Sequence, residues 1–328
     1  MKNQPVIRGF FDLQVNGYKG VDFSSPSLTE DEFVFACRAL FKTGTVGFLP
    51  TLITSSPDIY QRNLTLVSKL RLYKEFAHRI PGVHLEGPFI SPAEGYRGVH
   101  PQKDVQEASL AYYKKLEKWS GNAICLMTVS ATSPGAVRLC RYATEKGTII
   151  SLGHQDAGEK EITQMAAAGA TAVTHLGNGL PHLINRHQNP IWPALADDRL
   201  NAMFIADGFH LPPALLKTIL KAKGLHRCIM VSDLSPVSGL KPGPHGLWGH
   251  TVMLARNGFL HDPQSGYLAA SSFTLLNAAN YLLRSQLAGL QEIQQMAFLN
   301  PLRLLGLKPS QFPASHISYS KESGLQPD

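Results

Sequence analysis

The chain has 328 residues, of which 44% are hydrophobic and 17% are charged, so it can bury a sizeable core. No apolar stretch reaches the ~18 residues needed to cross a membrane, and a membrane protein is not expected. The formal net charge of +7 comes from Lys and Arg residues scattered along the chain, which argues against a nucleic-acid partner. Four widely separated cysteines in apolar contexts predict neither a metal motif nor a disulfide framework, so we expect a reduced, cytoplasmic compartment.

Short apolar runs alternate with amphipathic stretches from residue 6 to residue 231. The runs predict eight buried strands, at 6–15, 45–53, 82–86, 123–130, 148–153, 172–175, 201–206 and 228–231. The stretches between them predict helices at 29–43, 57–76, 104–119, 134–146, 159–168 and 212–223. Residues 178–199 predict a loop with at most a short helix around Ala194. This alternation predicts an α/β fold, a (β/α)8 TIM-type barrel that occupies residues 1–306.

The region after the eighth strand carries different patterns. Two alternating runs around Asn257 and Gly258 predict a β-hairpin inserted in the barrel at 249–268. Two further helices are expected, at 272–285 and 291–298. Residues 307–328 have no core-forming pattern and predict a short irregular C-terminal tail.

Candidate chemical side chains stand at the ends of five predicted strands. They are Glu86, His154, His175, His210 and Asp233. The C-terminal ends of parallel strands meet at one rim of a barrel, which is where barrel enzymes place their active sites. Packing alone poorly explains five such endings in register, so the sequence predicts an active site at this rim.

Three of these residues form a ligand set typical of a catalytic metal ion. Glu86, His154 and His175 offer one carboxylate and two imidazoles, which suit a divalent cation with an open coordination position, and zinc is the first choice. The alternative for a single strand-end His is a hydrogen-bonded structural role. Asp233 is the carboxylate expected to accept a proton from a metal-bound water and pass it to a leaving group. Its alternative role is a helix N-cap.

Long motifs in the chain resemble those of a known family. The segments PVIRGFFDLQVNG, LPTLIT, GVHLEGPFISP with GVHP, SLGHQDA, THLGNGLP, IADGFH and VSDLSPVSG occur in order from about residue 5 to residue 306. They are similar to the successive motifs of the N-acetylglucosamine-6-phosphate deacetylases, which belong to the amidohydrolase superfamily. The family usually flanks its barrel with a small β-sandwich, which we expect to be missing or reduced here.

The resemblance implies a role for each matching residue. Glu86, His154 and His175 match the metal ligands, and Asp233 matches the catalytic acid/base. His100 matches a catalytic histidine that polarises the acetamide carbonyl. Arg186 matches an arginine that reaches the sugar phosphate from a neighbouring subunit, which implies a homodimer or higher homo-oligomer. The remaining matches are implied substrate contacts, at Val99, His100, Asn178, Gly179, Asp207, Gly208, His210, Leu268, Ala269 and Ala270.

The first strand decides the expected number of metal ions. Dinuclear relatives carry His-x-His there, whereas this chain has Gln14 and Asn16, whose amides are poor zinc ligands. We therefore expect one divalent ion, with Zn²⁺ favoured by the ligand chemistry, and a small-molecule amino-sugar phosphate as substrate. The implied reaction is hydrolysis of N-acetylglucosamine 6-phosphate to glucosamine 6-phosphate and acetate. The alternatives are N-acetylgalactosamine 6-phosphate or another amide, and a weakly active or inactive barrel that acts as a binding protein.

Overall fold

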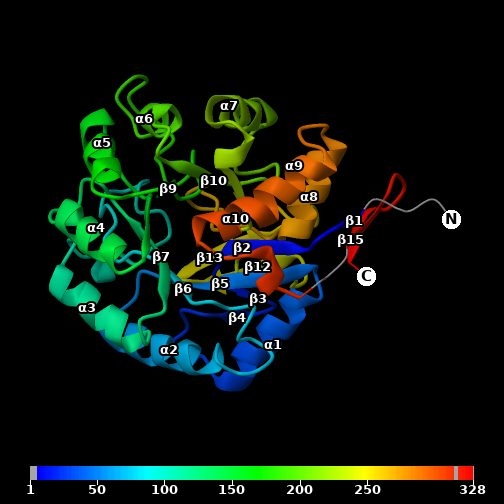
Figure 1. The fold of residues 1–328 in the computed structure, drawn as a ribbon, viewed down its shortest axis with the longest axis horizontal. Helices are drawn as coiled ribbons and strands as arrows, with labels where there is room; N and C mark the ends of the chain where they lie inside the picture. The colour runs from blue at the N-terminus through cyan, green and yellow to red at the C-terminus, as the bar shows by residue number, and fades with distance from the viewer. Residues whose placement is uncertain (1–5, 314–316, 328) are drawn as a thin grey trace.

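Eight parallel strands form the central sheet of the computed structural model, which describes residues 6–313 and 317–327 (Figure 1). The strand order is β11-β10-β9-β8-β7-β6-β5-β2. At the seam, Val15 bridges Leu234 and the Asn16 N–H donates to the Leu234 carbonyl at 2.9 Å, so the sheet nearly closes. The predicted barrel fold is confirmed. Its strands are β2 (Phe10–Val15), β5 (Thr45–Ile53), β6 (Val83–Glu86), β7 (Ile124–Val129), β8 (Ile149–Leu152), β9 (Ala172–Val173), β10 (Asn201–Ile205) and β11 (Cys228–Val231).

Helices surround this sheet in chain order (Figure 1). The helix α1 (Glu30–Phe41) begins where Thr29 and Glu32 form a reciprocal capping box, with three acidic residues in its first turn. The others are α2 (Pro57–Leu70), α3 (Leu110–Trp119), α4 (Ala136–Glu145), α5 (Glu159–Ala167), α6 (Ile191–Ala196), α7 (Pro213–Lys223), α8 (Leu275–Arg284), α9 (Leu290–Gln294) and α10 (Asn300–Leu304), with a π-helical turn, η3 (Gln295–Leu299), between the last two.

Two predicted helices are shorter in the structure. The helix predicted at 104–119 begins only at Leu110, because the Ser109 hydroxyl caps it by accepting the N–H of Tyr112 at 3.2 Å. The helix predicted at 57–76 ends at Leu70 and continues as turns.

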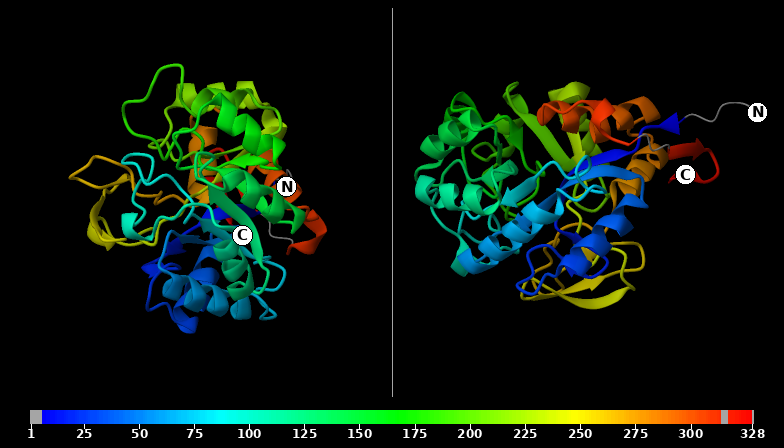
Figure 2. Two further views of the ribbon diagram at one scale, coloured as in Figure 1. Left: turned by 90° about the vertical axis from the view of Figure 1, so that its left-hand side faces the viewer. Right: turned by 60° about the horizontal axis from the view of Figure 1, so that its bottom comes forward.

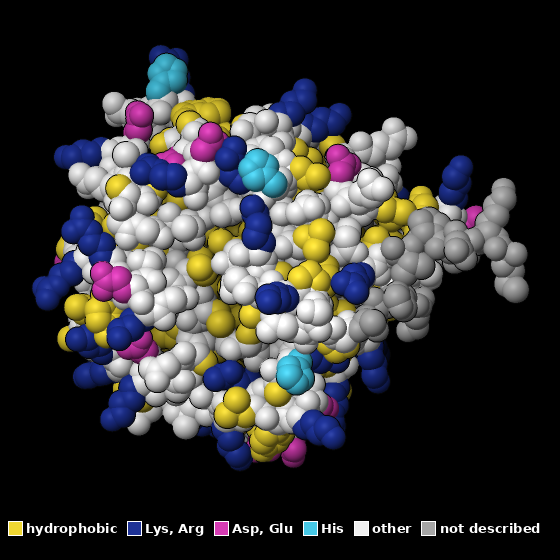
Figure 3. Space-filling model, viewed as in Figure 1, with side chains coloured by type: hydrophobic (Ala, Val, Ile, Leu, Met, Phe, Trp, Pro, Cys, Tyr) yellow, Lys and Arg dark blue, Asp and Glu magenta, His cyan; other side chains and the backbone are white. Residues whose placement is uncertain are grey.

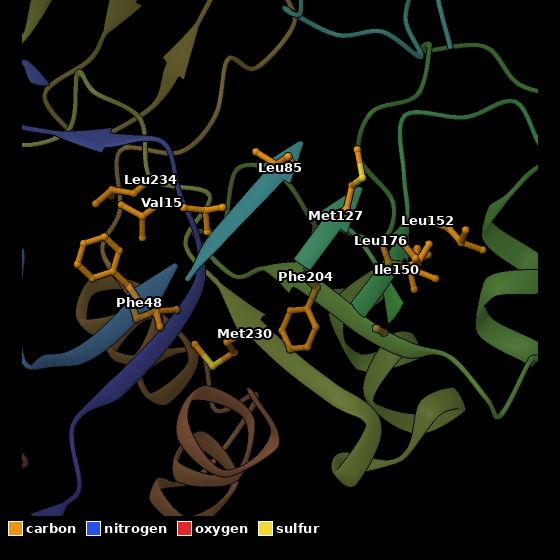
Figure 4. Close-up of a cluster of buried hydrophobic side chains, with 14 of the residues drawn as sticks. Val15, Phe48, Leu85, Met127, Ile150, Leu152, Leu176, Phe204, Met230 and Leu234 are labelled. Carbon is orange, nitrogen blue, oxygen red and sulfur yellow. The ribbon is translucent and has the colours of Figure 1, made fainter. Parts of the chain in front are cut away.

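Strand side chains alternate between two apolar clusters, one outside and one inside the barrel. Phe204 belongs to the outer cluster beneath the helices, whereas its neighbours Met203 and Ile205 belong to the inner one. Figure 4 shows part of the outer cluster, with Leu85, Met127, Phe204 and other labelled side chains drawn as sticks. The inner cluster is completed by Phe298 of η3 and Leu302 of α10, which lie against the barrel strands.

A separate small sheet lies beside the barrel and corrects two expectations. It has the order β1-β15-β16, formed by β1 (Val6–Ile7), β15 (Ile317–Ser320) and β16 (Gly324–Pro327). The strand predicted at 6–15 breaks at Gly9, whose φ of 50° favours glycine and where a Cβ would lie 2.3 Å from Val46. The irregular tail predicted at 307–328 is wrong for β15 and β16, whose Ile317 and Leu325 are fully buried.

The segment after β11 forms an antiparallel meander, of β12 (Gly243–Leu247), β13 (His250–Leu254) and β14 (Leu260–His261). The strands β13 and β14 pair around Asn257 and Gly258, where the sequence predicts a hairpin. The sequence missed β12 because Gly and Pro dominate it. In the left panel of Figure 2 the meander and the loops after β6 and β9 project to the same side of the barrel.

Charged residues are dispersed over the molecular surface seen in Figure 3. Lys and Arg side chains on this face are separated by uncharged and acidic ones and do not merge into a continuous basic area. None of the helices within residues 6–313 and 317–327 combines the length and the apolar character that crossing a bilayer requires.

Candidate active site

A buried carboxylate and two buried imidazoles meet at the C-terminal rim of the barrel. Glu86 ends β6, and His154 and His175 follow β8 and β9. Glu86 Oε1 lies 3.2 Å from His154 Nε2 and 3.0 Å from His175 Nε2, and the two Nε2 atoms are 3.1 Å apart. The sequence-predicted ligands are therefore brought to one point.

The donor atoms of this cluster fit a small divalent cation. Tetrahedral zinc with ligands at about 2.0–2.1 Å separates its donor atoms by roughly 3.3 Å, close to the spacing in the cluster. His154 Nδ1 lies 2.8 Å from the Tyr96 carbonyl and donates to it, which leaves Nε2 as the ring atom able to direct a lone pair at a cation. A lone pair directed at a carboxylate oxygen is unfavourable unless a cation lies between them.

The backbone at these strand ends adopts a left-handed conformation. The φ angles are 51° at His154, 30° at His175 and 49° at Asp233. Few residues other than glycine adopt such angles, and those that do gather at functional sites because the surrounding fold holds them there. The turn of the chain after each strand directs these side chains into one site.

The two carboxylates of the site titrate in opposite directions. Burial raises the pKa of Glu86, but the adjacent His154 and His175 imidazoles outweigh it and hold that pKa well below the ordinary value. Burial, aided by the charge of Glu86, raises the pKa of Asp233. The environment therefore favours an ionised Glu86 and a more basic Asp233, the separation expected of a ligand and a proton carrier.

Two amides of the first barrel strand connect these carboxylates. Gln14 Nε2 donates to Glu86 Oε1 at 2.9 Å and to Asp233 Oδ1 at 3.0 Å. Asn16 Nδ2 donates to the same Asp233 oxygen at 2.7 Å. The sequence singled out both residues as poor metal ligands but missed their role in orienting Asp233. Their position in the first strand could have indicated a place in the active site, because dinuclear relatives carry metal-binding histidines there.

A cavity of about 450 Å³ opens above the cluster. Most residues implied by the family resemblance line it together with the Glu-His-His cluster and Asp233: Val99, His100, Asn178, Gly179, His210, Leu268 and Ala270. The sequence did not indicate four further cavity-lining residues with aromatic side chains, namely His182, Trp248, Phe259 and Tyr267. His182 and Tyr267 stack with ring centroids 4.5 Å apart.

His100 is held as a neutral hydrogen-bond donor. Its Nδ1 accepts the Thr54 N–H at 3.3 Å and lies 2.9 Å from the Thr54 hydroxyl, which places the ring proton on Nε2. Burial lowers the pKa of His100 to about 3, so the ring stays uncharged at neutral pH. Its Nε2 lies 3.9 Å from Glu86 Oε2 and is directed into the site.

The structure places four of the implied substrate residues outside the cavity lining. Asp207 lies behind His210, whose Nδ1 is 2.7 Å from its Oδ2. Burial raises the pKa of Asp207, but the charge and hydrogen bonds of His210 outweigh burial and lower that pKa to about 2. Gly208 packs against Tyr281, and Ala269 is fully buried. Arg186 lies on the exposed loop after β9 and does not line the cavity of its own chain.

A barrel whose strand ends gather a Glu-His-His donor set beside a more basic Asp has the arrangement of an amidohydrolase, and this is the one such donor cluster in the part of the chain that the structure describes. No family model matches the chain. It is 31% identical to N-acetylglucosamine-6-phosphate deacetylase of Homo sapiens, over 92% of this chain and 75% of the relative, and belongs to that family. The Bacillus subtilis enzyme of the same name is 28% identical over 92% of this chain and 76% of its own length.

Other relatives bear on the sugar and on the fold. N-acetylgalactosamine-6-phosphate deacetylase of a Shewanella species is 29% identical over 92% of this chain and 74% of its own length. The fold resembles that of Mycobacterium smegmatis N-acetyl-D-glucosamine-6-phosphate deacetylase, solved with N-acetyl-D-glucosamine-6-phosphate (TM-score 0.88, 22% identity, 98% and 84% coverage). It also resembles the Pasteurella multocida enzyme (TM-score 0.87, 24% identity, 99% and 84% coverage).

Proposed function

We propose that the protein hydrolyses the acetamide of N-acetylglucosamine 6-phosphate to glucosamine 6-phosphate and acetate, as a cytoplasmic enzyme of amino-sugar catabolism. The observation that carries this proposal is the Glu86-His154-His175 cluster, with Asp233 joined to Glu86 through Gln14, at the base of a cavity. The family to which the chain belongs gives the substrate class. The four cysteines, all free thiols, suit the proposed compartment.

The cluster would hold one divalent ion, which we propose to be Zn²⁺. Glu86 Oε1, His154 Nε2 and His175 Nε2 would bind it, whereas Gln14 and Asn16 offer only amides where a second ion would need imidazoles. When bound, such an ion lowers the pKa of a water molecule and polarises a carbonyl group.

The protein's own side chains would handle the proton and the developing charge. Asp233 takes the proton of the attacking water and returns it to the departing amine, a task that its raised pKa favours. Gln14 and Asn16 hold Asp233 Oδ1 and leave Oδ2 free for this transfer. His100 donates from Nε2 to the carbonyl oxygen, which becomes negative as the tetrahedral state forms.

The sugar phosphate would lie toward the loop after β9. Asn178 and Gly179 line the cavity there, but none of its described lining residues is Lys or Arg. A phosphate dianion needs a cation, so we propose that Arg186 supplies it across a subunit interface in a homodimer or larger oligomer. The substitution Arg186→Ala should then raise KM for the phosphorylated sugar far more than it lowers kcat.

One assay tests the proposal and its alternatives. Purified protein with measured metal content is given N-acetylglucosamine 6-phosphate and N-acetylgalactosamine 6-phosphate, and acetate release is followed. Faster turnover of the galactosamine epimer would select the second substrate, which the Shewanella relative keeps open. No turnover of either sugar by metal-loaded protein would reject the deacetylase function and favour a binding role.

A further inference from the structure

Three apolar residues of the cavity lining lie in segments next to His100 or joined to such a segment. They are Ile53, Val99 and Trp248, and this set is called the apolar wall. Val99 directly precedes His100, and Ile53 directly precedes Thr54, which hydrogen-bonds to His100 Nδ1. Trp248 and Val99 pack against the same small core inside the meander. The residues of the apolar wall therefore belong to segments that carry or hold His100, the group that faces the carbonyl oxygen.

The indole of Trp248 is fixed by specific contacts. Its Nε1 donates to Asp22 Oδ2 at 3.1 Å, while Asp22 Oδ1 accepts the Ser24 N–H at 2.8 Å. The Ser24 hydroxyl in turn accepts the Ile53 N–H at 2.9 Å, so Trp248 is tied to the segment that carries Ile53. Trp248 also has a φ of 50° at the turn between β12 and β13. A bulky residue rarely adopts that conformation, and where a fold maintains it a functional reason is common.

The direction of the substrate amide follows from the two sides of Glu86. Gln14 links Asp233 to Glu86 Oε1, whereas His100 Nε2 lies nearer to Oε2, at 3.9 Å. An amide with its nitrogen toward Asp233 and its oxygen toward His100 has one remaining substituent on the carbonyl carbon, the acyl chain. The apolar wall is linked to His100 through Val99, which precedes it, and through Thr54, which follows Ile53, and its side chains are suited to cover a methyl group.

We propose that the apolar wall is the acyl subsite and that Trp248 sets the longest acyl chain that the cavity admits. This inference rests on the proposed deacetylase function. A rigid indole at the end of the subsite leaves room for an acetyl methyl and clashes with longer chains. Apolar pockets distinguish one methylene by about 10–200-fold in kcat/KM. Asp22 is then a positioning residue, which acts by holding the indole.

The test compares three substrates that differ only in the acyl chain: the N-acetyl, N-propionyl and N-butyryl derivatives of glucosamine 6-phosphate. Trp248→Ala should shift the propionyl-to-acetyl ratio of kcat/KM by about tenfold or more toward the longer chain, with metal content unchanged. Asp22→Ala should shift it in the same direction by less, because the indole remains but is released. Trp248→Phe keeps a ring and should shift it least.

The matched control is Phe259→Ala. Phe259 belongs to the same meander and lines the same cavity, but it packs against Phe209, which follows β10 and itself packs against Phe273. Phe259→Ala should therefore leave the acyl ratio unchanged. If Trp248→Ala lowered kcat/KM for all three substrates by one common factor, or Phe259→Ala shifted the ratio equally, the acyl subsite would be wrong. If the unaltered protein turned over none of them, the proposed function itself would fail, a distinct result.

Discussion

The two ends of the barrel interior are built in opposite ways. At the floor, Phe11 and Leu13 of β2 share one fully buried apolar cluster with Phe298 and Leu302 of the closing helical segment. At the rim, buried carboxylates, imidazoles and amides replace the apolar side chains, and the backbone is left-handed at three strand ends. Burial stabilises the floor, whereas at the rim it costs free energy and shifts pKa values. The free energy gained by apolar burial at the floor therefore offsets the cost of burying polar groups and of the left-handed backbone at the rim.

The strongest contrast is expected from removing a metal ligand at the rim. His175→Ala should abolish metal binding and turnover, because the two remaining protein ligands hold zinc poorly. Elemental analysis and the deacetylation assay would measure both. The matched control is His182→Ala, since His182 lines the same cavity but lies outside the ligand cluster. Metal retained at the wild-type level in His175→Ala would contradict the proposed ligand set.

The next largest effect should come from Asp233→Asn. The amide keeps the size of the side chain but removes the proton acceptor, so kcat should fall by about two to four orders of magnitude while metal content and folding persist. Steady-state kinetics on metal-analysed protein would check this. A variant with nearly normal kcat would assign the proton transfer to another group.

A substitution at the floor should show the reverse pattern. Phe298→Ala leaves a hole in the inner cluster and should lower the free energy of unfolding by about 3–5 kcal/mol. Metal content and kcat of the folded fraction should remain near wild type. Denaturant unfolding together with metal analysis would measure the two properties. Loss of the metal from the folded variant would show that floor and rim are not independent.

The smallest expected effect concerns Asp12, which lies between the two ends at the barrel seam. Its Oδ1 accepts the Ser232 N–H at 3.1 Å, and burial raises its pKa from 3.8 to about 7. The folded state therefore holds this proton more tightly than the unfolded state does. The stability that the group contributes is full below pH 3.8 and is lost as the pH rises through about 7.

Unfolding experiments between pH 4 and pH 7.5 would reveal this contribution. Asp12→Asn keeps the acceptor but cannot ionise, so its unfolding free energy should decline less with rising pH than that of the unaltered protein. Parallel pH profiles for the two proteins would show that Asp12 does not titrate in this range.

The sequence predicted the barrel and the ligand cluster because both depend on local patterns. A strand buried on both faces is a short apolar run, and Glu86, His154 and His175 stand at the ends of such runs. The roles of Gln14 and Thr54 escaped prediction because their partners are far away in the chain, 219 residues in the case of Gln14 and Asp233. The strands β15 and β16 were missed because their burial depends on pairing with β1 and on Asn280 of α8.

The seam between β2 and β11 has a consequence for synthesis of the chain. A ribosome releases Glu86, His154 and His175 well before it has made Asp233, and contacts between distant segments form late in folding. Gln14 cannot bind the carboxylate that follows β11 until Asp233, 219 residues further along the chain, has been made. Glu86, His154 and His175 are therefore all made before the seam can close, and its closure has to wait for the segment that carries Asp233 and Leu234.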